Sequence, residues 1–164
     1  MTGRRRTPTT DDRPEEDFGI LLLLAYQGFT RALHEDLAAH GLTDLRHNDG
    51  YVFRALAAGP RRIVDLANGL GVSKQAAAQI VSDMEARGLV TRGVDPDDAR
   101  AQRVELSTLG ARALRTARAF HERYESDLRD RLGPRNGAAL RGGLTAIIDA
   151  ELDEEDRSSL IRMP

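Results

Sequence analysis

The sequence contains no cysteine and no tryptophan, and aromatic residues make up only 4% of its 164 positions. The absence of cysteine excludes disulfide bonds and any switch based on thiol oxidation. With so few aromatic rings, a core has to be built from aliphatic side chains, and the many Leu and Ala residues favour a mainly helical protein.

Long apolar runs and a strong net charge are also missing. The longest apolar run extends from Ile20 to Tyr26, far below the roughly 20 residues that a membrane-spanning helix needs. The basic segment Arg4–Arg6 is not followed by the apolar stretch of a signal peptide, so we expect a cytoplasmic protein without a membrane partner. The formal net charge of −2 gives no overall attraction to phosphate, so any contact with nucleic acid has to come from a local basic surface.

Signs of catalysis and of metal binding are missing as well. The sequence has no glycine-rich phosphate loop, no Ser-His-Asp arrangement and no metal-ligand spacing. His34 and His40 lie six positions apart, which does not stack them on one helical face for zinc. The sequence therefore predicts no metal and no cofactor, and the lack of a nucleophile–base pair argues against a small enzyme.

The informative stretch runs from Ile63 to Arg103. Apolar residues recur in it twice with the i, i+3, i+4, i+7 spacing of one buried helical face. The first series is Ile63, Leu66, Ala67 and Leu70, and the second is Ala77, Ile80, Val81 and Met84. Between the two, Gly71 can adopt a positive φ, Val72 can fill the angle, and Ser73 can cap the second helix by accepting a backbone N–H. This pattern predicts two crossed helices joined by a tight turn.

A β-hairpin is expected directly after the second helix. Gly88 is the expected C-terminal stop of that helix. Residues 89–92 and 103–106 alternate like paired strands, and the intervening Asp95-Pro96-Asp97-Asp98 is typical of a turn. The order of helix, turn, helix and hairpin is that of a winged helix-turn-helix, and we interpret it as a fold that lies on DNA.

Longer helices are expected on both sides of this stretch. The first should run from Arg13 to about Ala39, with Asp12 and Glu15 as a capping pair. Its apolar residues cover more than one face, which indicates burial against a partner subunit. Further helices are predicted over about 48–58, 107–132 and 135–152 from apolar periodicity.

Several spacings of the central block agree together with one known pattern. The block reads Asp65-Leu66-Ala67, Leu70-Gly71-Val72-Ser73, Glu85-Ala86-Arg87-Gly88-Leu89-Val90, Asp95-Pro96-Asp97-Asp98, Arg103-Val104-Glu105-Leu106-Ser107 and Gly110. It resembles the MarR family of bacterial transcription regulators, in which the first helix and the last two helices of two chains interlock. The resemblance implies a dimerisation helix at 13–42, a DNA-binding lobe at 43–106 and dimerisation helices at 107–152. Composition predicts a mobile tail at 1–12, which has almost nothing to bury, and a solvated acidic tail at 153–164.

The outward face of the second helix supplies the candidate base-reading residues. The major groove of B-DNA accepts one α-helix, whose N-terminal side chains reach the base edges. The predicted groove residues are Ser73, Lys74, Gln75, Ala78 and Gln79. Gln75 or Gln79 could bond adenine, Lys74 could reach guanine or a phosphate, and Ala78 could touch a thymine methyl group.

Arginines around these helices are candidates for contacts with the DNA backbone or minor groove. The candidates are Arg92, Arg100 and Arg103 in the hairpin and Arg61 and Arg62 before the first helix. The resemblance places Arg100 in the flanking minor groove, whereas Asp95 or Asp98 could instead hold an arginine of the hairpin by an ion pair. Arg61 and Arg62 could pair with phosphates or remain solvated loop residues.

Two departures from the family pattern reduce the expected cationic charge. Ala99 stands where the family usually carries an arginine, and Gln79 stands where many relatives carry another. Fewer cations at the interface mean a weaker salt dependence of DNA binding.

The sequence predicts a homodimeric, sequence-specific DNA-binding transcription regulator. Two reading helices about one DNA turn apart, ~34–36 Å, imply an inverted-repeat operator. The resemblance further implies a repressor released by a small-molecule effector that binds between the dimer helices and the DNA-binding lobe. From position alone we nominate Tyr26, His47 and Tyr51 as polar groups of that effector site. The competing hypothesis is a winged-helix protein-interaction module without DNA binding, which the near-neutral charge and the acidic hairpin tip favour.

Overall fold

The computed structural model describes residues 17–96 and 98–152, with residues 98–100 described by their backbone alone. The predicted tails at 1–12 and 153–164 lie outside the described residues, as does the predicted capping pair of Asp12 and Glu15. The elements are, in chain order, α1 (Phe18–Ala39), α2 (Asp49–Leu56), β1 (Arg61–Arg62), α3 (Ile63–Leu70), α4 (Lys74–Ala86), β2 (Val90–Asp95), β3 (Asp98–Leu106), α5 (Thr108–Leu132) and α6 (Pro134–Glu151). The described α1 therefore begins at Phe18, later than the predicted start at Arg13.

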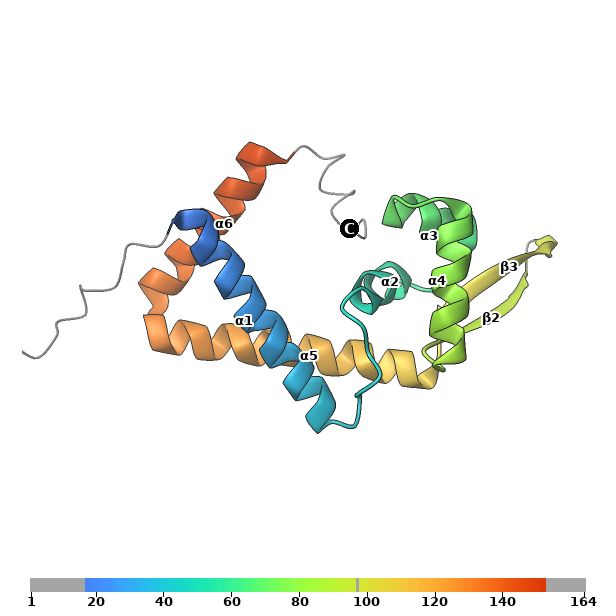
Figure 1. Ribbon diagram of the computed structural model, residues 1–164, viewed down its shortest axis with the longest axis horizontal. Coiled ribbons are helices and arrows are strands. Elements are labelled where there is room, and N and C mark those ends of the chain that lie inside the picture. Colours follow the sequence, from blue (N-terminus) through green and yellow to red (C-terminus); the bar gives the residue numbers. More distant parts are fainter. Residues whose placement is uncertain (1–16, 97, 153–164) are drawn as a thin grey trace, which may run out of the picture.

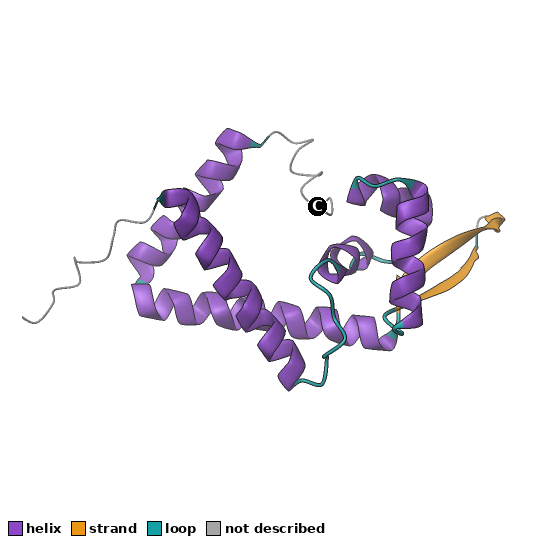
Figure 2. Ribbon diagram, viewed as in Figure 1, coloured by secondary structure: helices purple, strands orange, loops and turns teal. Residues whose placement is uncertain are grey.

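The helices divide into two groups that α5 connects. One end of α5 contacts α6, its middle contacts α1, and its other end contacts α2 and β3 (Figure 1). The second group holds α2, α3, α4 and the small sheet, whose hairpin projects away from the helices (Figure 2). The prediction of a mainly helical protein with a β-hairpin wing is confirmed.

The helix-turn-helix forms as its apolar spacing predicts. Leu66, Leu70, Val81 and Met84 are at most 1% exposed and belong to one core cluster. Gly71 ends α3 with φ 62°, a left-handed conformation that glycine adopts without steric cost. The prediction that α3 and α4 bury their apolar faces together is therefore confirmed.

A three-stranded antiparallel sheet replaces the simple hairpin expected from the sequence. Its strand order is β1-β3-β2, and the hairpin register pairs Val90 with Leu106. Arg61 and Arg62, for which the sequence left a phosphate contact or a solvated loop open, form β1 and pair with Val104 and Arg103. The alternative of a loop is wrong because β3 lies between β2 and the segment after Pro60, so its second edge has backbone groups that need partners.

The start of α5 is fixed against the end of the helix-turn-helix. The hydroxyl of Ser107 accepts the N–H of Gly110 at 3.0 Å and donates to the carbonyl of Gly88 at 2.5 Å. A Cβ atom at position 110 would overlap the carbonyl oxygen of Leu89, so only glycine allows this approach. The lobe and the long helix α5 are thereby joined closely.

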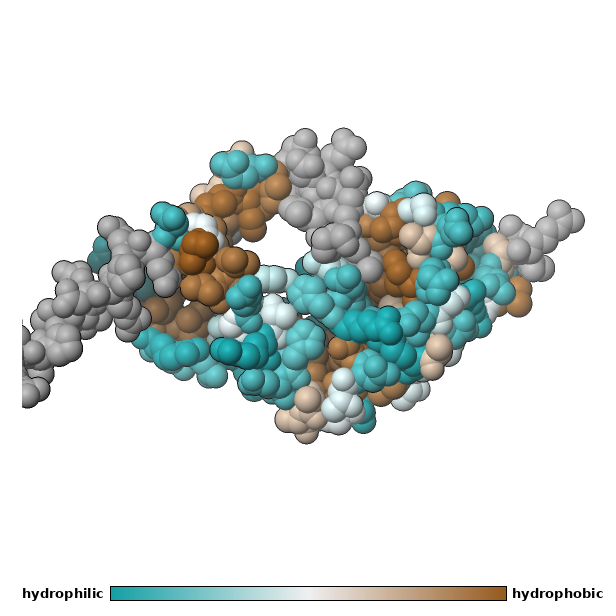
Figure 3. Space-filling view, viewed as in Figure 1, coloured by the Kyte–Doolittle hydropathy of each residue, from teal (hydrophilic) through white to brown (hydrophobic). Residues whose placement is uncertain are grey.

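Apolar side chains are exposed along α1 and α6. Figure 3 shows them as a continuous apolar region over these two helices. They include Phe18, Ile20, Leu21, Leu23, Leu24, Leu140, Leu144 and Ile148, between 42% and 63% exposed. None of the described helices combines the length and the apolarity that crossing a bilayer demands.

Candidate nucleic-acid interface

The predicted groove residues lie together on the outward face of α4. Ser73, Lys74, Gln75 and Gln79 are exposed, whereas Ala78 is half-buried. The opposite face of the same helix is buried in the core through Ala77, Val81 and Met84. The helix therefore presents one polar ridge of small and medium side chains to solvent.

Ser73 prepares the N-terminus of this ridge. Its hydroxyl oxygen accepts the backbone N–H of Ala76 at 3.1 Å, which confirms the predicted N-cap. The first turn of α4 carries no acidic residue. The partial positive charge of the helix N-terminus is therefore not neutralised locally, which suits an approaching phosphate.

Asp95, at the turn end of β2, engages two of the predicted arginines. Its carboxylate is buried, and it pairs with Arg103 at 3.0 Å and with Arg62 at 2.5 Å. The predicted alternative, an ion pair that holds an arginine of the hairpin in place, is confirmed for Arg103. Direct contact of Arg62 or Arg103 with DNA would have to compete with this buried carboxylate.

Arg92 lies against the exposed side of α4, next to the reading ridge. It pairs with Glu85 at 3.1 Å and donates to the hydroxyl of Ser82 at 2.5 Å, so it connects β2 to α4. Arg61 keeps an exposed position and donates to the carbonyl of Ala55. The side chain of Arg100 lies outside the described part of the chain, so its role in the minor groove stays a prediction.

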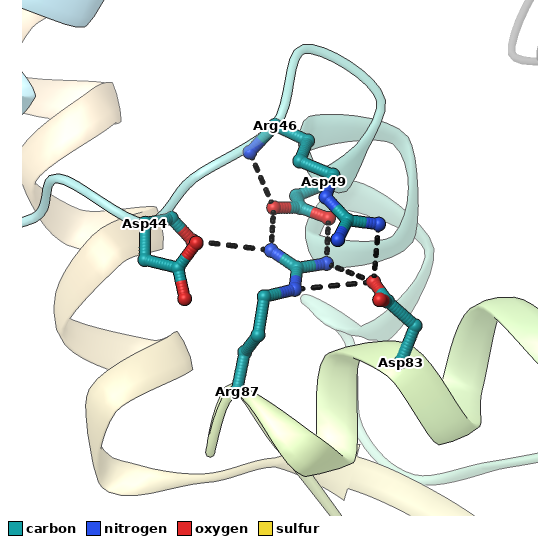
Figure 4. Close-up of polar contacts among 5 residues, drawn as sticks. All are labelled: Asp44, Arg46, Asp49, Asp83 and Arg87. Carbon is teal, nitrogen blue, oxygen red and sulfur yellow. Dashed lines mark hydrogen bonds and ion pairs between the residues drawn. The ribbon is translucent and has the colours of Figure 1, made fainter.

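An ion-pair cluster that the sequence did not predict joins α4 to the segment before α2 (Figure 4). Arg87 follows the last residue of α4 and donates to both carboxylate oxygens of Asp49, at 2.6 and 2.8 Å. It also donates to Asp83 at 2.7 and 3.1 Å and to the carbonyl of Asp44 at 3.1 Å. Asp83 receives a further bond from Arg46 at 2.8 Å.

The cluster shifts the protonation equilibria of its members. The hydrogen bonds to Asp49, followed by those to Asp83, raise the pKa of Arg87 above its ordinary value. The hydrogen bonds from Arg87 are the main cause of a lowered pKa of Asp83. Both groups therefore keep their charges throughout the physiological pH range. The spacing of Asp83 and Arg87 on one helix is visible in the sequence, but Asp49 is far from both, and no local signal identifies it as their partner.

The three nominated effector residues line one cavity. The cavity has a volume of about 910 Å³ and lies among α1, α2, the segment before α2, and α5. Tyr26, His47 and Tyr51 border it, and the hydroxyl of Tyr26 lies 2.9 Å from Nε2 of His47. Its walls are mainly apolar, with Phe29, Leu33, Leu37, Phe53 and Leu114 among them.

His121 also borders the cavity. Its ring lies 5.1 Å, centroid to centroid, from that of Phe29. Partial burial, with a smaller contribution from the charge of Arg54, lowers the pKa of His121. Within the described residues, no group of three or more His, Asp or Glu side chains is placed to hold a metal ion.

Comparison with known proteins identifies one family and one fold. A family model described as the MarR family matches residues 40–101. Among curated proteins, none matches this chain. The structure of the S. aureus MepR–DNA complex is 17% identical with a TM-score of 0.67, and the match covers 82% of this chain and 100% of that one.

Two further solved structures share this fold. S. aureus MepR bound to ethidium bromide is 18% identical with a TM-score of 0.61, over 84% of this chain and 99% of that one. Wild-type MarR of E. coli in its apo form is 22% identical with a TM-score of 0.58, over 82% of this chain and 99% of that one.

Proposed function

Because the chain belongs to the MarR family of transcription regulators, which it matches over residues 40–101, we propose that it binds double-stranded DNA and regulates transcription. The observation that carries the proposal is the polar ridge of α4, which is exposed beside a hairpin held by ion pairs. A protein of this fold, MepR, has been crystallised with DNA. A regulator of this kind acts in the bacterial cytoplasm, where the DNA lies.

The ridge reads bases in the major groove. Gln75 and Gln79 carry amides that match adenine, and Lys74 reaches guanine or a phosphate. The hairpin approaches the flanking minor groove through Arg100. Arg62, Arg92 and Arg103 hold the ridge and the hairpin in place, because each is engaged by a carboxylate.

The regulator acts as a homodimer on an inverted repeat. The exposed apolar side chains of α1 and α6 support this assembly, since contiguous apolar surfaces of this kind are rare on monomeric proteins (Figure 3). A two-fold axis then presents two copies of α4 to successive turns of the major groove.

The cavity beside Tyr26, His47 and Tyr51 holds a small-molecule effector that releases the repressor from DNA. Its position between α1 and the lobe supports this role, because a ligand there contacts both parts. MepR, a protein of the same fold, has been crystallised with ethidium bromide.

A gel shift with the DNA beside the protein's own gene tests the proposal. Wild-type protein should retard this fragment at concentrations that leave an unrelated fragment free. The Lys74→Ala/Gln75→Ala double variant should lose the difference between the two fragments. Equal retardation of both fragments by the wild type, or no retardation, would refute the proposal of sequence-specific DNA binding.

One observation favours a winged-helix protein-interaction module instead. Arg62, Arg92 and Arg103 are all engaged by carboxylates, which leaves less free positive charge on this side of the lobe than a DNA-binding surface usually carries. The salt dependence of binding separates the two functions. DNA binding predicts an affinity that falls steeply with salt, whereas a protein module shows no affinity for DNA at low salt.

A further inference from the structure

Arg87, at the end of α4, joins this helix to a part of the protein that is distant from it in sequence. Its guanidinium reaches the carbonyl of Asp44, the carboxylate of Asp49 and the carboxylate of Asp83. Asp44 and Asp49 lie on the segment that leads from α1 into the lobe, and Asp83 lies on α4 (Figure 4). We call this segment, residues 44–49, the connector.

The contact between Arg87 and the connector is largely closed to solvent. The side chains of Arg87 and Asp49 are 9% and 6% exposed, and their pairing uses both carboxylate oxygens. A two-point contact between planar groups fixes orientation as well as distance. Asp49 also accepts the backbone N–H of Arg46 at 2.7 Å, so the connector is folded around the same carboxylate.

The connector separates the effector cavity from the reading helix. Arg46, His47 and Asp49 border the cavity of about 910 Å³ on one side. The same three residues border a second cavity of about 420 Å³ on the other side, together with Gln79, Asp83 and Arg87. A displacement of the connector therefore shifts the end of α4 next to Arg87.

We propose that Arg87 is a positioning residue for DNA reading, which holds α4 to the connector and so sets the angle at which Ser73 to Gln79 meet the major groove. It acts through Asp49 and Asp83 and touches no base. On the opposite flank, Arg92 ties α4 to β2 through Glu85 and Ser82, so the two arginines together fix the rotation of the helix. This inference rests on the proposed function of α4 as the reading helix.

Hydrogen–deuterium exchange of the full-length chain, measured in the absence of DNA, tests whether Arg87 holds α4 to the connector. Arg87→Met should speed exchange in residues 43–49 and 74–86, while α5 should stay as slow as in the wild type. Arg129→Met is the matched control, because it removes the same charge and an i, i+4 pair with Glu125 from the surface of α5. Faster exchange spread over the whole lobe, including α3, would reduce Arg87 to a general stabiliser and overturn the inference, as would unchanged exchange in the connector.

A second variant guards against misfolding of Arg87→Met. Asp83→Asn leaves the pair of Arg87 with Asp49 intact, so the connector keeps its main contact, and it weakens the bonds that Asp83 on α4 accepts from Arg87 and Arg46. It should therefore speed exchange in residues 74–86 more than in the connector. Equal or absent effects on the two segments would contradict the assigned linkage.

Fluorescence anisotropy on a selected duplex and on its scrambled version tests the consequence for DNA. Arg87→Met should lose roughly 2- to 30-fold in preference for the selected duplex, the range found for substitutions that act on coupling without touching a ligand. Its affinity for the scrambled duplex should equal that of Arg129→Met. A wild type that binds neither duplex would refute the proposed function, whereas an unchanged preference of Arg87→Met would refute the positioning role alone.

Discussion

The hydroxyl of Tyr26 on α1 lies 2.9 Å from Nε2 of His47 on the connector. This hydrogen bond crosses from the long apolar helix α1 to the lobe that carries the reading helix. Both residues border the same cavity, with Tyr51 of α2 on the same wall. A ligand that enters the cavity therefore meets the bond that joins the two parts.

Loss of the His47 side chain should weaken binding of an apolar anion in this cavity. The dye 8-anilino-1-naphthalenesulfonate is a suitable probe, because its fluorescence rises in apolar surroundings. We expect His47→Ala to reduce its affinity by roughly 2- to 10-fold, the equivalent of one hydrogen bond. His40→Ala, on the exposed end of α1, is the control and should leave the titration unchanged. Identical titrations of wild type and His47→Ala would argue against a ligand at this wall.

Gln75→Ala and Arg100→Ala should weaken DNA binding in different ways. As a proposed base-reading residue, Gln75 should on its loss cost about 1–3 kcal/mol on the preferred duplex and relax the preference at one position. Arg100 is proposed to contact DNA regardless of sequence, so its loss should weaken binding to all duplexes by a similar factor and lower the salt slope. Anisotropy titrations at several salt concentrations distinguish the two patterns. Unchanged binding by both variants would withdraw these two assignments.

Gly110→Ala should destabilise the protein. The added methyl group would overlap the carbonyl oxygen of Leu89, where backbone cannot move aside easily. We expect a loss of about 1–3 kcal/mol in the free energy of unfolding, as for other overpacked sites. Gly69→Ala on α3, where nothing lies within 4 Å of the added group, should instead gain about 0.5–1 kcal/mol. Urea unfolding of both variants makes the comparison, and equal stabilities would contradict the close approach of α5 to Leu89.

Ionisation of His121 should make the protein less stable on the acid side of neutrality. Partial burial, and to a lesser degree Arg54, lower the pKa of His121 in the folded state below the ordinary 6.5. As the pH falls below 6.5, the unfolded chain takes up a proton that the folded chain does not, so the free energy of unfolding decreases. His121→Gln should flatten this slope between the two pKa values. Parallel pH profiles for the wild type and His121→Gln would contradict the assignment.

Leu144→Glu should dissociate the dimer without unfolding the protomer. Leu144 is 42% exposed on α6, so the protomer alone tolerates a charge there, whereas an apolar interface does not. Val94→Glu makes the same kind of change on the hairpin, at a residue 71% exposed, and should leave the dimer intact. Sedimentation velocity at several concentrations measures the shift. A wild type that sediments as a monomer at all of them would contradict the homodimer.

Much of the lobe follows from short-range sequence signals. Apolar residues recur every three or four positions in α3 and α4, so the sequence predicts that Leu66, Leu70, Val81 and Met84 are buried. Gly71 ends α3 with a positive φ, and Ser73 caps the N-terminus of α4. Both are local properties. These features were predictable because their physical cause lies within one helical turn.

Long-range pairing explains what the sequence did not reveal. Arg61 and Arg62 form a strand of only two residues, too short to show a period, and its formation depends on the edge of β3. The pairs of Asp49 with Arg87 and of Asp95 with Arg62 join residues more than 30 positions apart. From the sequence alone, charged residues so far apart along the chain are expected on the solvated surface. Only the fold shows that they pair.

Selection and sequencing of the DNA bound by the purified protein is the most direct measurement. Randomised duplexes recovered over several rounds should converge on an inverted repeat whose half-sites are centred about one helical turn apart, roughly 10 base pairs. The Lys74→Ala/Gln75→Ala variant should not enrich that repeat. A selection in which the wild type enriches no common sequence would contradict the account of α4 as a paired reading helix.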